Sequence, residues 1–199
     1  MLTDGYHPVP PGKIAAIVTH LEMAERPSRP ARPLPDGVTL RPVAAPGTDW
    51  YRNLFTRIGG VDWLWVSRLR MPDAELGAIL ADRAVEVRAV EVAGRAEGLL
   101  ELDFRAARRP ELAFFGLTPA LQGRGIGSAL MAEATRLAFA RDIDCLTIHT
   151  CTLDSPVALP FYLRCGFVPL RREVEIVDDP RLAGTLPRDA GPHHPIIPG

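Results

Sequence analysis

Apolar and polar residues alternate with a period of two along residues 84–104, the pattern of a half-buried β-strand. The parity of the apolar positions changes once, which predicts a bulge near Ala89, and Gly94-Arg95 predicts a hairpin turn. Residues 111–117 are apolar on both faces, which favours a central strand covered above and below. Further strands are predicted at residues 38–43, 145–151 and 167–177.

Apolar residues recur at helical spacing in other parts of the chain. A first helix is predicted to start at Thr48 or Asp49 and to stop at Gly59-Gly60. A broken helical region follows at residues 63–80, a main helix at residues 126–141, and a short helix at residues 156–164. This order of elements predicts an α/β fold, a mixed twisted sheet flanked by helices.

Proline marks the boundaries of one domain, since nine of the 20 prolines precede Thr48 and five lie from Pro180 onward. The packed domain is expected at residues 37–178, between an N-terminal extension, 1–36, and a proline-rich C-terminal tail, 179–199.

The extension and the tail carry weaker signals. Residues 12–23 are apolar enough for an extra strand or a short helix laid on the domain, and residues 26–35 read as a polyproline II linker. His193-His194 has no partner at metal-ligand spacing, so we predict no metal site and a solvated tail.

Composition excludes several classes of protein. Twenty-three basic and 24 acidic residues leave a net charge of −1, so neither nucleic acid nor an anionic membrane is expected as a partner. No signal peptide or membrane span is recognisable, which makes a cytoplasmic location the expectation. Three cysteines without framework spacing indicate reduced thiols.

The central strand leads into a glycine-rich entry to the main helix, Gln122-Gly123-Arg124-Gly125-Ile126-Gly127-Ser128. Alternating glycines leave main-chain amides open, and the helix dipole adds positive potential, so an anion such as a pyrophosphate is the expected guest. A Walker loop is excluded because the chain has a single lysine, Lys13, far from this loop. A dinucleotide fingerprint fits poorly, because residues 119–122 separate the glycines from the strand. A glycine-rich helix start without a ligand remains the alternative.

This Gln-x-x-Gly-x-Gly loop after a strand resembles the acyl-CoA loop of the GNAT superfamily of N-acyltransferases. A second patch, from Ser155 through Ala158 and Phe161-Tyr162 to Gly166-Phe167, is similar to that family's Asn-x-x-Ala helix leading to Tyr and Gly-Phe. The resemblance covers about residues 38–177 and implies a GNAT-like fold with acetyl-CoA (coenzyme A) as cofactor.

The resemblance also implies which residues bind that cofactor. The strand end would lie along the pantetheine arm, and the loop would hold the pyrophosphate. The implied cofactor-binding residues are Phe115, Gly116, Leu117, Thr118, Gln122, Gly123, Arg124, Gly125, Ile126, Gly127, Ser128 and Ser155.

Two catalytic residues are implied. Tyr162 matches the family's tyrosine and would protonate the leaving thiolate, and Glu111 stands where protein-acetylating members carry a catalytic glutamate and would act as base. Tyr162 could instead be a buried tyrosine bonded to a carbonyl. Glu101 and His149 are alternative bases, although His149 shares strand parity with two cysteines, which favours a core or edge histidine.

Two departures from the family pattern stand out. Ser155 replaces an asparagine, and Asp154 beside it could compensate for or repel the cofactor. Only one strand follows the short helix where the family usually has two, so the missing edge would come from the N-terminal segment or from a second subunit, a possible homodimer.

The expected function is transfer of an acetyl group from acetyl-CoA to a primary amine of a small molecule or peptide, by direct attack in a ternary complex. The alternative is a non-catalytic acyl-CoA-binding or interaction module. The acceptor is not readable from the sequence.

Overall fold

The computed structural model describes residues 3–27 and 33–199, and part of the expected polyproline II linker lies outside the described residues. The elements of the N-terminal half are β1 (Lys13–Met23), β2 (Val38–Pro42), α1 (Thr48–Phe55), η1 (Thr56–Gly60), α2 (Val61–Trp63), α3 (Ser67–Arg70), α4 (Asp73–Ala81) and β3 (Val85–Val92). Those that follow are β4 (Arg95–Asp103), β5 (Glu111–Leu117), η2 (Pro119–Leu121), α5 (Ile126–Ala138), β6 (Leu146–Cys151), α6 (Ala158–Cys165) and β7 (Val168–Asp178).

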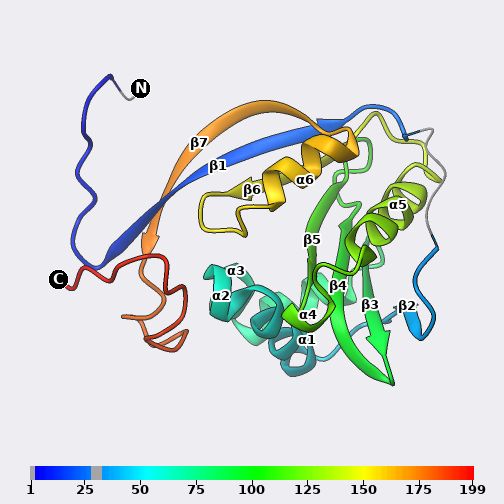
Figure 1. Ribbon diagram of the computed structural model, residues 1–199, viewed down its shortest axis with the longest axis horizontal. Coiled ribbons are helices and arrows are strands. Elements are labelled where there is room, and N and C mark those ends of the chain that lie inside the picture. The colour runs from blue at the N-terminus through cyan, green and yellow to red at the C-terminus, as the bar shows by residue number, and fades with distance from the viewer. Residues whose placement is uncertain (1–2, 28–32) are drawn as a thin grey trace.

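Seven strands form one mixed sheet in the order β2-β3-β4-β5-β6-β1-β7. All neighbours pair antiparallel except β5 and β6, which are parallel. Helices α5 and α6 cover one face, and the segment from α1 to α4 covers the other (Figure 1). The predicted fold class, an α/β sheet flanked by helices, is confirmed.

The N-terminal segment is a strand, not a helix, and it lies inside the sheet. β1 pairs with β6 through residues 18–23 and with β7 along its length, so β7 becomes the sheet edge. Figure 1 shows β1 and β7 as a long curved pair on one side of the molecule. β1 buries side chains on both faces of the sheet: Ile14, Ala16 and Val18 alternate on one face, and Leu21 and Met23 are buried on the other. This burial explains why an apolar segment outside the proline boundary joins the sheet.

Gly59-Gly60 does not stop the first helix as predicted. The chain continues through the π turn η1 into α2, which ends at Leu64 in a left-handed conformation. A Cβ on Gly59 would lie 2.1 Å from the Trp65 ring, so this glycine is required for close packing.

Two predicted features are shifted. The irregularity predicted near Ala89 lies between Val90 and Glu91, and the extra residue is Glu97 of β4. The parity of the apolar residues of β3 changes because the strand is covered on both faces: Val85 and Val87 pack against the α1 side, and Val90 packs against the α5 side. The main helix ends at Ala138, before Arg141.

The C-terminal tail is packed where solvation was expected. Arg181 and Asp179 form an ion pair at 2.7 Å, and both side chains are buried. The Arg181 guanidinium also donates to the carbonyls of Ala190 and Gly191, and the Gly191 amide donates to Val61 at 2.7 Å. The tail therefore buttresses the α2 segment. Among the described residues, no helix has the length and apolarity that a membrane crossing requires.

Candidate active site

β5 and β6 separate soon after they meet. Their ladder has one pair, Glu111 with Thr147, and from there the strands diverge. A cavity of about 280 Å³ fills the space between them, which we call the split cavity. Its walls come from residues 112–117 of β5, residues 148–151 of β6, the start of α6, and the α2–α3 segment, so sheet and helices meet at one site.

A bulge in β5 turns the strand at this point. Glu101 pairs with Phe114 and Leu102 with Leu112, so Ala113 is the extra residue. After the bulge, Phe115 stacks on Phe161 with ring centroids 5.9 Å apart, while Phe114 points to the α1 side.

Backbone alternation decides which β5 amides face the split cavity. The Thr118 amide donates to Glu97 on β4 at 2.9 Å, so the Gly116 amide points the same way and those of Phe115 and Leu117 point to the open side. The family resemblance assigns the amides of Phe115, Gly116 and Leu117 to the cofactor. Those of Phe115 and Leu117 face the cavity, and that of Gly116 does not. Gly116 has another role, because a Cβ there would lie 2.4 Å from Ile58.

The glycine loop presents open main chain. Gly123 and Gly125 have φ values of +74° and +77°, and a Cβ at either position would meet no described atom within 4 Å. The amides of residues 123–125 donate to no other described residue, and those of Ile126 and Gly127 belong to the first turn of α5, which has no intrahelical acceptors. The loop therefore offers an anion open space and several main-chain hydrogen-bond donors.

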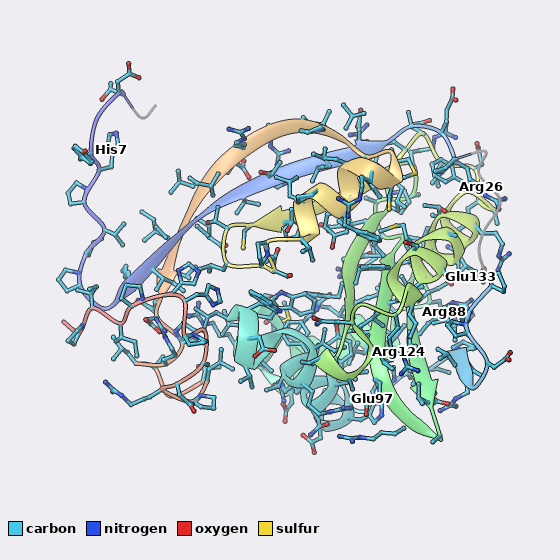
Figure 2. The ribbon with its side chains drawn as sticks, in the orientation of Figure 1. His7, Arg26, Arg88, Glu97, Arg124 and Glu133 are labelled. Carbon is cyan, nitrogen blue, oxygen red and sulfur yellow. The ribbon has the colours of Figure 1, made fainter. Side chains whose placement is uncertain are left out.

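The other residues predicted to bind the cofactor at this loop differ in their exposure and in whether they line the split cavity. Gln122 lines the split cavity and donates to the Leu117 carbonyl at 3.1 Å. Arg124, labelled in Figure 2, and Ser128 are exposed at the entry to α5. The Ile126 side chain is in the core, so only its amide is available. Thr118 is buried and donates to Glu97 at 2.7 Å, and it does not line the cavity.

Tyr162 lies on α6 and lines the split cavity. Its ring packs edge-on against Phe115 and Phe167, and only 7% of the residue is exposed. Its hydroxyl makes no hydrogen bond to a described residue, which removes the alternative of a carbonyl-bonded tyrosine. Burial raises the pKa of Tyr162 far above its ordinary value, so the phenol keeps its proton at neutral pH.

Glu111 and His149 form a pair across the parallel strands. Glu111 Oε1 lies 2.6 Å from His149 Nδ1, and His149 lines the split cavity whereas Glu111 does not. The hydrogen bond to Glu111 raises the pKa of His149 above its usual value. The His149 ring also lies 5.8 Å from that of His20 on β1. His149 is therefore not a core histidine, because its side chain is 48% exposed and lines the cavity, although Glu111 satisfies one of its ring nitrogens.

Glu101 is unsuited to act as base. Its side chain is fully buried, accepts hydrogen bonds from Tyr51 and Arg68, and does not line the cavity. Arg68 also lies over the Phe114 ring, 5.0 Å from its centroid. The network joins α1, α3 and β4 behind the β5 bulge.

The β6–α6 loop carries Asp154 and Ser155, which both line the cavity. The Asp154 carboxylate accepts from the Trp65 indole at 2.7 Å, from the Thr150 hydroxyl at 2.6 Å and from the Cys151 amide at 2.9 Å. The Asp154 carboxylate is therefore hydrogen-bonded within the protein, and its bond with Trp65 connects the α2–α3 wall to this loop.

Sequence reasoning missed part of the lining. Ile14 and Val18 of β1 and Glu175 and Val177 of β7 line the cavity. Strand alternation predicts that Ile14 and Val18 share one face of β1 and that Glu175 and Val177 share one face of β7. The local pattern does not predict that β1 lies beside β6 and β7 beside β1, because these pairings are long-range.

The family model described as "Acetyltransferase (GNAT) family" matches residues 49–167. The chain belongs to the GNAT acetyltransferase family. Its members' acyltransferase chemistry accords with the glycine loop and the split cavity described above. No curated protein matches the sequence.

Solved structures share the fold. A putative acetyltransferase from the GNAT family of Novosphingobium aromaticivorans is 18% identical with a TM-score of 0.53, over 84% of this chain and 68% of that one. A GCN5-related N-acetyltransferase from Sphaerobacter thermophilus is 17% identical with a TM-score of 0.59, over 87% and 53%. An aminoglycoside acetyltransferase from an uncultured soil metagenomic sample, in complex with sisomicin, is 14% identical with a TM-score of 0.51, over 65% and 88%. Several matched structures are longer, and the chain spans 51–63% of their length.

Proposed function

We propose that the chain is an N-acetyltransferase that moves the acetyl group of acetyl-CoA to a primary amine of a small molecule or peptide, by direct attack in a ternary complex. The observation that carries the proposal is the continuity of the site. Open amides at the entry to α5 adjoin the cavity that holds the Tyr162 hydroxyl and the His149 imidazole.

The residues at the loop suit a coenzyme A diphosphate. Space above Gly123 and Gly125 and the unused amides of residues 123–127 provide donors at the positive end of α5, and Arg124 adds a charge. The Phe115 and Leu117 amides face the cavity, where they would bind the pantetheine arm and polarise a thioester carbonyl. Bound acetyl-CoA would supply the activated acetyl group. Ser155 lines the same space.

Proton removal is assigned to Glu111 acting through His149. With Nδ1 held by the carboxylate at 2.6 Å, Nε2 of the neutral ring is the atom left to accept a proton from the amine, directly or through a water molecule. Glu111 thereby becomes a positioning residue, and His149 is the proton acceptor.

Proton return is assigned to Tyr162. Its phenol stays protonated at neutral pH and lies at the wall of the cavity, so it can donate to the departing thiolate.

The test is thiol release from acetyl-CoA in the presence of a panel of primary amines. We expect turnover with at least one amine and a loss of kcat of about 100-fold or more in Tyr162→Phe, the usual range for removal of a general acid. Calorimetry should show that Tyr162→Phe binds CoA as the unaltered protein does, because the hydroxyl acts on the thiolate and not on the diphosphate.

Tight binding of CoA without turnover across the panel would instead indicate a non-catalytic acyl-CoA-binding module. Equal kcat for Tyr162→Phe and the unaltered protein would contradict the role given to Tyr162.

A further inference from the structure

β7 is an edge strand of the sheet, because the N-terminal strand β1 occupies the position between it and β6. Figure 1 shows β7 as the outer arc of the curved β1–β7 pair. Pro169 and a register shift at Leu170 disturb the start of the strand, but from Arg171 to Asp178 the pairing with β1 is regular. That stretch has no proline, lysine or bulge, which are the features that commonly keep an edge strand from pairing further.

Alternate residues of this stretch direct their main-chain groups away from the sheet. The Ile17 amide donates to the Thr152 hydroxyl at 3.0 Å, and the Ile17 carbonyl accepts from the Thr152 amide at 3.1 Å, so Ile17 faces β6. Its partner on β7, Val174, therefore points to the open edge, as do the other even-numbered residues of the stretch. No described residue bonds the amides and carbonyls of Arg172, Val174 and Ile176 there. The edge offers this row of donors and acceptors to an added strand.

The side chains beside this row are apolar and exposed. Val174 is 44% exposed and Ile176 is 48% exposed, and Ile17, opposite Val174 on β1, is 41% exposed. Five of the 11 large apolar side chains that are exposed among the described residues lie on these two strands: Ile17, Val168, Leu170, Val174 and Ile176. Apolar area gathered along an unpaired strand is typical of a surface that another chain covers.

The charges along β7 favour a second copy of the same strand as that chain. Arg171 and Arg172 precede the middle residue of the strand, Glu173, whereas Glu175 and Asp178 follow it. If two copies pair antiparallel about a two-fold axis at Glu173, the whole strand pairs with its copy. Arg171 of each copy then lies opposite the partner's Glu175, so two pairs of opposite charge form across the axis. An in-register parallel pairing would instead set like charges side by side.

The same register accommodates the remaining side chains. Leu170 of each copy lies opposite the partner's Ile176, which buries exposed apolar area on both sides of the axis. The two Glu173 carboxylates meet at the axis, and each has cationic partners in its own copy. His20 Nε2 lies 2.6 Å and Arg171 Nε lies 3.5 Å from the Glu173 carboxylate.

We propose that the protein is a homodimer in which the β7 strands of two copies pair antiparallel about a two-fold axis at Glu173. The two seven-stranded sheets then form one continuous sheet across the interface. The N-terminal strand already completes the sheet of each copy, so the dimer adds a neighbour to β7 and replaces no strand.

Sedimentation analysis of the unaltered protein tests the assembly. We expect twice the mass of one chain, and the mass of a single chain for Val174→Lys, because this change sets a lysine opposite the partner's Arg172 on both sides of the axis. Val61→Lys is the matched control, since Val61 is 42% exposed and lies on α2, outside the sheet. It should remain a dimer.

A disulfide tests the position of the axis. Opposite residues in a non-hydrogen-bonded antiparallel pair have Cα atoms about 4.5 Å apart, a separation that a disulfide can span. Oxidised glutathione should therefore join Glu173→Cys into a covalent dimer. Asp178→Cys should not be joined, because in this register Asp178 lies opposite the partner's Val168, at the far end of the strand from the partner's Asp178.

A single-chain mass for the unaltered protein throughout a dilution series would overturn this inference, whether or not the variants fold. A dimer that persists in Val174→Lys, open-ended aggregates in place of dimers, or equal cross-linking of Glu173→Cys and Asp178→Cys would also overturn it. None of these outcomes bears on acetyl transfer, which thiol release with the amine panel measures separately.

Discussion

At the scale of single residues, the His149 imidazole has one nitrogen free for chemistry. Nδ1 is held by Glu111, and this hydrogen bond raises the pKa of His149. A proton acceptor must be neutral, so activity should be absent at low pH and rise as the pH passes through the pKa of His149. The carboxylate places that rise at a higher pH than an isolated histidine would.

Glu111→Gln tests this pairing. Without the carboxylate the pKa of His149 falls, so the acidic limb of the kcat profile should move to lower pH, and kcat on the plateau should fall because the ring is held less well. The measurement is a pH profile with one acceptor for both proteins, so that the acceptor's own ionisation cancels. An acidic limb that stays in place or moves to higher pH would refute the role of Glu111.

Local spacing reveals some of these residues and not others. The glycine loop and Tyr162 are readable because their chemistry depends on neighbours within a few positions, and the structure puts both beside one cavity. The Glu111–His149 pair spans 38 positions and needs the register of two parallel strands, which no local pattern encodes. The sequence leaves Glu101 as an alternative base, and only its burial beneath Tyr51 and Arg68 in the folded chain excludes it.

At the scale of secondary-structure elements, the buried Tyr51–Glu101–Arg68 network fastens α1 and α3 to β4. Burial raises the pKa of Glu101, an effect that Arg68 and Tyr51 oppose. Arg68→Met leaves the carboxylate buried without its cation, and should destabilise the protein by about 3–5 kcal/mol, the usual cost of breaking a buried pair from one side.

Urea unfolding measures this free energy. The control is Arg41→Met, which removes a guanidinium from an exposed pair with Glu91 and should lower the free energy of unfolding much less, because water screens an exposed pair. Similar losses in the two variants would show that the buried network does not hold the helices on the sheet.

At the scale of the whole molecule, the N-terminal strand completes the sheet. β1 separates β6 from β7 and contributes Leu21 and Met23 to the core beneath α6. The proline pattern predicts a domain that begins after residue 36. Proline content indicates where the chain is extended, but it does not indicate whether an extended segment pairs with other strands. The apolar run in residues 12–23 was visible, but its place inside the sheet follows from pairing with strands more than 120 positions away.

Truncation should show this dependence. Removal of residues 1–24 would leave β6 and β7 without their shared neighbouring strand and remove Leu21 and Met23 from the core, so we expect aggregation or loss of cooperative thermal unfolding. Removal of residues 1–10, which precede β1 and are exposed where described, should leave the Tm unchanged. A cooperatively folded protein of unchanged Tm without residues 1–24 would contradict the role of β1.

The proposed CoA site depends most on the open amides at the entry to α5, and calorimetric titration with CoA tests them directly. Gly125→Val should lower CoA affinity at least tenfold by closing the approach to the loop. Gly94→Val is the control, since Gly94 has φ +78° against +77° for Gly125 and equally open surroundings, but lies in the β3–β4 turn. We predict strong CoA binding by the unaltered protein and by Gly94→Val and weak binding by Gly125→Val, and equal affinity of all three proteins would contradict the proposed site.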